Sequence, residues 1–310
     1  MHEEVIPLVN MDKQKYLAST LEMAVGSAHG VAFHHGLGTP LKPASSTPVA
    51  KYLNADSLSE YAASAYSKSN FAIVGNGVAH AELSKWVSEF FGDVPSQPLA
   101  KLSSEPSKYY GGEERISHGS GNSLVLAFPG SSAPTGPSYK PEAAVLAALL
   151  GGQSTIKWSP GFSLLSNAAK DTPLMHITTK SNIYSDAGLL SIELHGSASD
   201  IRATAPKVVD ALKAVAQGID KEAFAKAKAL AKFKELEYGS ETQAAMELTG
   251  AGLVQGGKAY QIDQVAKSVD GVTIESVKEF AKKALEGKAS VAAVGDLFVL
   301  PWAEEIGLKV

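Results

Sequence analysis

Three residues that follow the short apolar run 71–74 could form part of a nucleotide-binding turn. Gly75 and Gly77 take the first two glycine positions of a Gly-x-Gly-x-x-Gly fingerprint, and His80 takes the third. In that fingerprint the glycines let the backbone approach a pyrophosphate, and an acidic residue about 20 positions further on binds the ribose. Here Pro95 and a Pro, Ser and Gly rich stretch occupy that region instead. We therefore interpret the segment as a tight strand-to-helix turn without a nucleotide.

Histidine is the next residue type that could carry chemistry, because a neutral imidazole binds zinc. The histidines are His2, His29, His34, His35, His80, His118, His176 and His195. No two of them have the spacing His-x-x-x-His, His-Glu-x-x-His or His-x-x-Glu-His, which places two ligands on one face of a helix. We therefore predict no metal site, and we interpret His34 and His35, beside Gly36, as loop residues.

Other segments contain residues typical of catalytic or binding loops. Gly119-Ser120-Gly121 lacks the Gly-x-Ser-x-Gly pattern of a nucleophile elbow. The run from Gly151 to Ser154 follows a predicted helix, whose negative end would repel a phosphate. The lysines between residues 221 and 234 could indicate a membrane-surface helix, but Glu235 and Glu237 favour a solvated face. These residues predict no catalytic, cofactor-binding or metal-binding site.

The composition of the chain restricts the class of protein to which it can belong. The chain has 310 residues, of which 45% are hydrophobic and 19% charged, as in a globular protein of about two domains. Its formal charge of -4 provides no basic field for nucleic acid. The absence of cysteine excludes disulfides and thiolate sites. Its apolar runs, such as 143–150, are too short to cross a membrane.

Hydrophobic periodicity predicts helices and strands that alternate irregularly along the chain. A capping box at Ser57 and Glu60 predicts a helix start, and Ser185-Asp186-Ala187-Gly188 predicts a hairpin turn. Helices are expected over about 12–25, 57–66, 83–91, 141–150, 201–218 and 221–238 and from 240 onward, and strands over 71–74, 123–128, 174–183 and 189–195. Since the hairpin pairs antiparallel strands, we predict an α+β fold with mainly antiparallel sheets.

An internal similarity indicates a repeat. The helix and strand up to Asn76 match the helix and strand up to Asp296, at an offset of 219 to 220 residues. Chance similarity remains an alternative, because the pattern is generic. If the repeat is real, the chain begins in the middle of its first copy. We expect the second half of an N-terminal unit at 1–95, a linker at 96–121 and a complete C-terminal unit at 122–310.

Several motifs resemble the pitrilysin-type, or inverzincin, peptidase family. His29 to Phe33 and Leu37 to Pro40 are similar to the family's His-Ala-x-Ala-Phe and Leu-Gly-x-Pro motifs. The family is built from tandem α+β units of about this period. Residues 69–83 are similar to the strand and helix near the end of the family's first unit. Residues 108–115, 145–152 and 182–189 look specifically like the family's branch that forms core protein 2 of the mitochondrial cytochrome b-c1 complex.

The resemblance implies a chain without catalytic activity. Membership of the core protein 2 branch carries this implication. The absence of the zinc-binding His-x-x-Glu-His does not carry it by itself, because in active relatives that motif lies in the half-unit expected to precede residue 1. Active relatives also orient substrate with an Arg and a Tyr in the second unit. Tyr184 stands near that place, but no arginine lies between Arg115 and Arg202. The substrate clamp is therefore expected to be dismantled.

The same resemblance implies a structural role in respiratory complex III. The expected partners are core protein 1, cytochrome b, cytochrome c1 and the other subunits of the complex. The expected location is the matrix side of the mitochondrial inner membrane, peripheral and without a transmembrane segment. Two alternatives remain open: an α-type subunit of the mitochondrial processing peptidase that binds presequence peptides, and a generic binding module. The fragment alone is expected to self-associate, because an incomplete unit exposes an apolar face.

Overall fold

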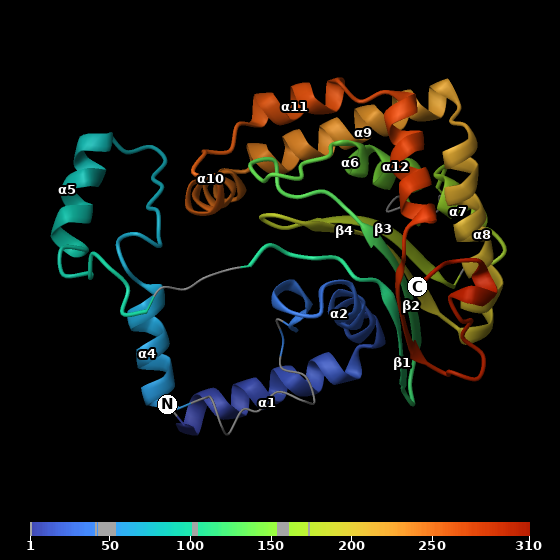
Figure 1. Cartoon of the computed structure of the whole chain (residues 1–310), viewed down its shortest axis with the longest axis horizontal. Coiled ribbons are helices and arrows are strands. Elements are labelled where there is room, and N and C mark those ends of the chain that lie inside the picture. The colour runs from blue at the N-terminus through green and yellow to red at the C-terminus, as the bar shows by residue number, and fades with distance from the viewer. Residues whose placement is uncertain (1, 41, 43–53, 101–104, 154–160, 173) are drawn as a thin grey trace.

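The computed structural model describes residues 2–40, 42, 54–100, 105–153, 161–172 and 174–310 (Figure 1). Among these residues five strands form one sheet: β1 (Gly112–Ser117), β2 (Asn122–Pro129), β3 (His176–Ile183), β4 (Gly188–Gly196) and β5 (Ser290–Gly295). Their order in the sheet is β1-β5-β2-β4-β3. Only the β1–β5 pair is parallel, and the other three pairs are antiparallel. The predicted α+β class with a mainly antiparallel sheet is confirmed.

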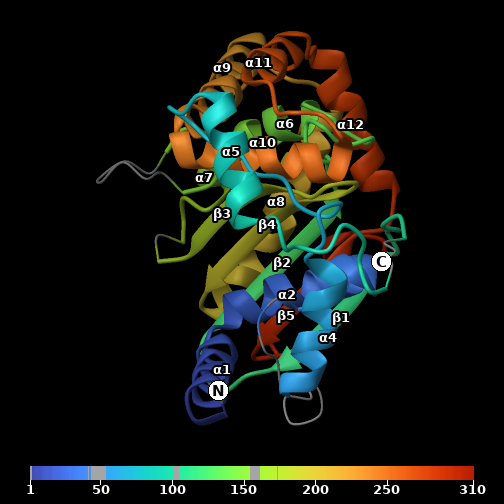
Figure 2. The ribbon, with the colours of Figure 1, turned by 90° about the vertical axis from the view of Figure 1, so that its left-hand side faces the viewer.

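Helices surround this sheet on both faces (Figures 1 and 2). The N-terminal part contributes α1 (His2–Ala18) and α2 (Thr20–Phe33), and it also forms α4 (Ala55–Ala65) and α5 (His80–Phe90), which lie apart from the sheet in Figure 1. The rest contributes α6 (Glu142–Leu150), α7 (Leu164–Ala168), α8 (Ala198–Gln217), α9 (Lys221–Ser240), α10 (Thr242–Gly256), α11 (Ile262–Asp270) and α12 (Ile274–Glu286). No helix among the described residues is long and apolar enough to span a membrane.

The larger core lies between the sheet and the C-terminal helices. Successive side chains of a strand point to opposite faces, so Leu124, Leu126 and Phe128 of β2 all face this core. There they meet buried side chains of α6, α8 and α12. Helices α9 and α11 form a further layer outside α6, as Figure 1 shows. The order of layers is therefore sheet, inner helices, outer helices.

Helix α2 covers the opposite face of the sheet and forms a second core. Its fully buried Ala24, Ala28 and Ala32 lie four residues apart, so they follow one face of the helix. These small side chains let α2 pack closely against Val125 of β2 and Val294 of β5. A helix from the first hundred residues thus packs on a sheet whose strands all come after residue 111.

The structure differs from the sequence expectation in two helices and one strand. The expected helix over 12–25 is divided, because Ser19 caps the start of α2 by accepting a hydrogen bond from the Glu22 amide. The capping box at Ser57 is wrong, since Asn54 caps α4. The strand expected over 71–74 is absent, and Ile73 is 36% exposed. No described strand pairs with that segment, and an unpaired extended segment does not form a sheet.

The expected linker over 96–121 also contains a strand. β1 pairs along its whole length with β5, from Gly112 beside Ser290 to Ser117 beside Gly295. The partner lies nearly 180 residues away, and the sequence of β1 is too polar to show strand periodicity. Of this segment, residues 101–104 lie outside the described residues. The strand at 123–128 and the hairpin over 174–195 are confirmed as β2 and as β3 with β4.

The hairpin turn brings Gly188 against a neighbouring backbone and yields a stability prediction. A Cβ atom at Gly188 would lie closer to the Ser131 carbonyl oxygen than van der Waals contact allows. We expect Gly188→Ala to lower the free energy of unfolding by about 1–3 kcal/mol, because backbone at that distance must move. Chemical denaturation measures the change. Gly119→Ala, where a Cβ meets nothing within 4 Å, is the control. Equal effects of the two substitutions would contradict the prediction.

Candidate functional site

The residues that suggested metal or nucleotide chemistry are dispersed over the fold. Among the described residues, no three His, Asp or Glu side chains gather into a group that could hold a metal ion. Gly75 and Gly77 lie in an irregular segment and bend before α5, so the turn follows no strand. His34 and His35 do lie in the loop after α2, as expected, and the His34 ring stacks on Tyr110 with centroids 4.0 Å apart.

The glycines after α6 make contacts with the sheet. Gly151 ends α6, and its carbonyl accepts a hydrogen bond of 3.0 Å from the Thr179 amide. The amide of Gln153 donates to the Ile177 carbonyl at 2.8 Å. Ser154, the last residue of that run, lies outside the described residues. These hydrogen bonds attach the end of α6 to the edge of β3.

Tyr184 meets a histidine of the family motif. The Tyr184 hydroxyl lies 2.6 Å from His29 Nε2, and His29 Nδ1 lies 2.7 Å from the Val25 carbonyl oxygen. A carbonyl only accepts, so Nδ1 carries a hydrogen and donates it. In a neutral ring Nε2 then accepts from the tyrosine. Burial raises the pKa of Tyr184, which keeps its hydroxyl protonated. The pair joins α2 to the hairpin.

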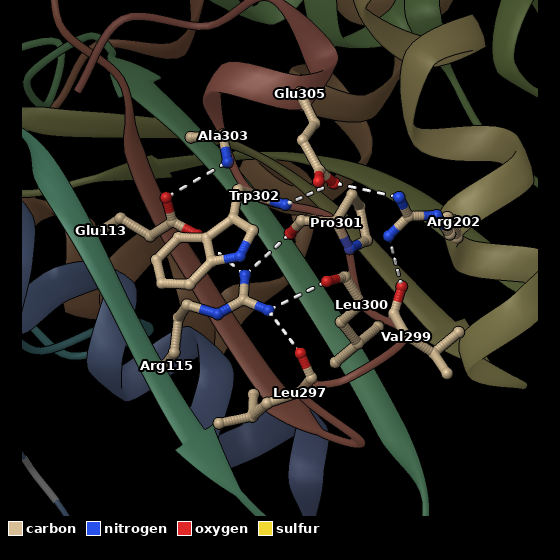
Figure 3. A network of polar contacts seen from close by, with 10 residues as sticks. All are labelled: Glu113, Arg115, Arg202, Leu297, Val299, Leu300, Pro301, Trp302, Ala303 and Glu305. Carbon is tan, nitrogen blue, oxygen red and sulfur yellow. Dashed lines mark hydrogen bonds and ion pairs between the residues drawn. The ribbon is translucent and has the colours of Figure 1, made fainter.

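A network of polar contacts surrounds Arg115 of β1, as Figure 3 shows. The side chain is 8% exposed and contacts Glu113 Oε1 at 3.0 Å. Its two terminal nitrogens donate to three backbone carbonyls, those of Leu297 at 3.1 Å, Leu300 at 2.9 Å and Pro301 at 2.8 Å. The guanidinium also lies 4.0 Å from the ring centroid of Trp302. One buried cation thus fixes the backbone after β5.

Two carboxylates and a second arginine complete this cluster. The second oxygen of Glu113 accepts from the Ala303 amide at 3.1 Å. Arg202 of α8 donates to the Val299 carbonyl at 2.9 Å and lies 3.3 Å from Glu305, which accepts from the Trp302 amide (Figure 3). Each charged group is paired or bonded to backbone. This arrangement holds the chain in place and leaves none of its charges unpaired.

Sequence reasoning missed this role of Arg115. One signal was present, because Glu113 and Arg115 are two residues apart and therefore share a face of a strand. Arg115 and Arg202, between which the sequence has no arginine, both contact the segment 297–305. Tyr184 lies elsewhere, beside His29. The structure therefore does not bring Tyr184 together with either arginine through any described contact.

A carboxyl on α9 lies in surroundings that disfavour its charge. Burial raises the pKa of Glu235, and no described hydrogen bond compensates for it. One turn along the helix, Gly239 leaves room for the Tyr260 hydroxyl, which has no hydrogen-bond partner among the described residues. Burial, with the charge of Glu235 second, raises the pKa of Tyr260 to about 12. Charged Glu235 therefore costs stability.

Replacement of Glu235 tests this cost through its dependence on pH. A raised carboxyl pKa means that the folded state binds the proton more tightly than the unfolded chain, so stability falls as pH rises from the ordinary carboxyl value through the raised one. We expect Glu235→Gln to raise the melting temperature at pH 7 and to have no effect at pH 3 to 4. The exposed Glu237→Gln is the control. A gain that is equal at both pH values would contradict the prediction.

Comparison with known proteins agrees with the resemblance seen in the sequence. The model of the family "Peptidase M16 inactive domain" matches residues 52–230. The mitochondrial cytochrome b-c1 complex subunit 2 of Neurospora crassa is 46% identical over 300 residues, which are 96% of this chain and 65% of that protein. The subunit 2 of Schizosaccharomyces pombe is 32% identical over 308 residues, which are 98% of this chain and 68% of that protein.

Two further matches have lower sequence identity. The mitochondrial-processing peptidase subunit alpha-2 of Dictyostelium discoideum is 27% identical over 98% of this chain. The solved structure "Complex III2 from Candida albicans, Inz-5 bound" contains a chain that superposes with a TM-score of 0.80 at 15% identity, over 97% of this chain and 72% of that one. This likeness confirms the fold.

The chain spans about two thirds of the length of the subunit 2 relatives, 65% of one and 68% of another. Both the family model and the relatives above 30% identity place it in one family. The chain belongs to the M16 peptidase family, through the domain described as inactive, and is related to subunit 2 of the mitochondrial cytochrome b-c1 complex.

Proposed function

We propose that this chain acts as a non-catalytic structural subunit of respiratory complex III, the ubiquinol-cytochrome c reductase, and supports the assembly and stability of that complex. The observation that carries the proposal is the 46% identity to a cytochrome b-c1 complex subunit 2 over 96% of the chain. The matched family model is described as an inactive domain. The Arg115 cluster fits this role, because its charges stabilise a backbone segment.

The proposal includes partners and a location. The chain packs with core protein 1, cytochrome b and cytochrome c1 on the matrix side of the mitochondrial inner membrane, as a peripheral subunit. It needs no cofactor of its own, because electron transfer belongs to the other subunits of the complex. The name of the Neurospora crassa relative, which includes the words "complex" and "mitochondrial", supports this proposal.

Gentle solubilisation of mitochondria tests this function directly. Full-length tagged protein should migrate on a native gel together with cytochrome b and core protein 1. The purified protein should bind no zinc stoichiometrically and cleave no presequence peptide. Separate migration, with complex III intact, would refute the structural role. Chelator-sensitive cleavage by the protein alone would instead establish a peptidase.

An α-type subunit of the mitochondrial processing peptidase is the second candidate. The 27% identity to such a subunit from Dictyostelium discoideum favours it over an unrelated binding module. That identity is well below the 46% shared with a subunit 2 protein. Saturable binding of a presequence peptide to the full-length protein outside complex III would support this candidate. Presence of the protein only in complex III would exclude it.

We also propose that the chain contains parts of two repeated units, 1–95 and 122–310, joined by the segment 96–121. The helices α4 and α12 occur at the expected offset, although the strand after α12 has no counterpart after α4. At an offset of 220, α2 matches residues 240–253, most of which lie in α10. An experimental structure of the full-length protein should show the helix-strand arrangement of residues 276–296 again at residues 57–76. A different topology at residues 57–76 would contradict the two-unit division.

A further inference from the structure

Two aromatic side chains point into solvent from the segment between β5 and residue 303. Phe298 is 100% exposed, and Trp302 is 53% exposed. Full exposure of a phenylalanine is unfavourable in water, because burying such a side chain stabilises a protein by about 1.5–3 kcal/mol. The segment belongs to the core-forming part of the chain, and the neighbouring Leu300 and Ala303 are buried. The exposure of Phe298 therefore does not reflect a loosely packed region.

The backbone that carries these aromatic side chains is held along its length. The Asp296 amide donates to the Asn122 side-chain oxygen at 2.8 Å, and the Asp296 carboxylate accepts from the Phe298 amide at 3.1 Å. The following carbonyls and amides, those of residues 297 and 299–303, bond to Arg115, Arg202, Glu113, Glu305 or the Asp296 carbonyl. A side chain on such a backbone loses little conformational entropy when a partner covers it. The segment presents Phe298 in a preorganised form.

Both signs of charge lie beside the aromatic side chains, but the acids outnumber the bases. The acids of the segment 296–305 are Asp296, Glu304 and Glu305, and it contains no Lys or Arg. Arg202 pairs with Glu305. Arg115 pairs with Glu113 and lies beneath the Trp302 ring. The carboxylates of Asp296 and Glu304 thus remain without an ion pair among the described contacts.

We propose that residues 296–305 form a docking surface on which Phe298 and Trp302 enter an apolar pocket of another protein subunit, with a basic rim that faces Asp296 and Glu304. Preorganised aromatic side chains carry much of the binding energy of protein interfaces. The acidic flanks require positive charge on the partner, since like charges at an interface are costly. The inference rests on the proposed function, because the partner is another subunit of the same complex.

Radical footprinting tests the surface in the intact assembly. Purified complex III that contains the full-length protein, and the same protein released from it, are exposed to hydroxyl radicals, and oxidation of Phe298 and Trp302 is measured by mass spectrometry. We expect oxidation of Phe298 to be at least about fivefold slower in the complex, because a central interface residue is shielded from water. Equal oxidation in both samples would overturn the inference while leaving the proposed function intact. Absence of the protein from complex III would refute both.

Substitutions test whether the aromatic side chain contributes to binding. Phe298→Ser should reduce retention of the protein in complex III by about tenfold, because serine cannot fill the apolar pocket of the partner. Phe233→Ser, at a largely exposed phenylalanine of α9, is the matched control and should not reduce it. Glu304→Lys should reduce retention, whereas Glu237→Lys on α9 should not. Because the Phe298 side chain is fully exposed in the free chain, its replacement should not change the melting temperature. An unchanged melting temperature then shows that the variant folds. Normal retention of both Phe298→Ser and Glu304→Lys would overturn the inference.

Discussion

Replacement of Arg115 by leucine is expected to lower the free energy of unfolding by about 3–5 kcal/mol, the range for removal of one partner from a buried ion pair. The side chain is 8% exposed, so water cannot take over its role. Its loss leaves the Glu113 carboxylate without a cation and the carbonyls of Leu297, Leu300 and Pro301 without a donor. Unpaired buried acceptors of this kind are costly. Urea denaturation measures the change.

Two controls separate the buried charge from simple loss of an arginine. Arg202→Leu removes a half-exposed arginine from the same segment and should cost only about 0–1 kcal/mol from its ion pair. Adding Glu113→Gln to Arg115→Leu should recover part of the loss, because the amide still accepts from the Ala303 amide without an unpaired charge. Equal costs for Arg115→Leu and Arg202→Leu would show that the Arg115 cluster does not anchor residues 297–303.

The sequence predicted those parts of the fold whose signals are local. The hairpin was found because Ser185 to Gly188 are turn residues between two apolar runs, and it forms as β3 and β4. The helix after Pro141 was found because proline is tolerated at a helix start. Both features depend on residues within about ten positions of one another, which is the range over which periodicity and turn chemistry act.

Two helix starts were also misplaced, because Ser19 and Asn54 act as caps, but the errors about strands occurred where pairing partners are distant. β1 was included in a linker because its polar residues show no periodicity, yet β5 supplies its hydrogen bonds from nearly 180 residues away. Residues 71–74 have the apolar character of a strand, but no described strand lies beside them. A strand is stabilised by its neighbour, so composition alone cannot distinguish a paired segment from an unpaired one.

In the candidate site, too, local signals were predictable and contacts between distant residues were not. The resemblance located Tyr184, whose motif is continuous in sequence, but not its contact with His29, 155 residues away. The Arg115 cluster joins β1, α8 and the segment after β5, which are adjacent only in the folded chain (Figure 3). Charged residues in a polar strand usually indicate a solvated edge. Only the tertiary structure shows that this arginine is buried.

A second large effect is expected on the face of the sheet beside α2. Lys180 of β3 contacts Glu193 of β4 at 2.8 Å. The glutamate is 4% exposed, and its other described contact is a distant one, 3.4 Å from the Ser191 hydroxyl. Lys180→Met keeps most of the aliphatic chain but leaves this carboxylate unpaired. We expect a loss of about 1–3 kcal/mol, less than for Arg115 because Lys180 is half-exposed and water partly replaces it.

Comparison of single and double variants decides whether the carboxylate causes that loss. Lys180→Met combined with Glu193→Gln should be more stable than Lys180→Met alone, because no charge then remains buried in the sheet. Lys207→Met, which breaks an exposed contact of 3.2 Å with Asp171, should cost no more than about 0–1 kcal/mol. If the double variant is less stable than Lys180→Met, then Glu193 stabilises β4 through its hydrogen bonds, and its pairing with Lys180 is of minor importance. The two outcomes differ in sign, so thermal unfolding of the three variants distinguishes them.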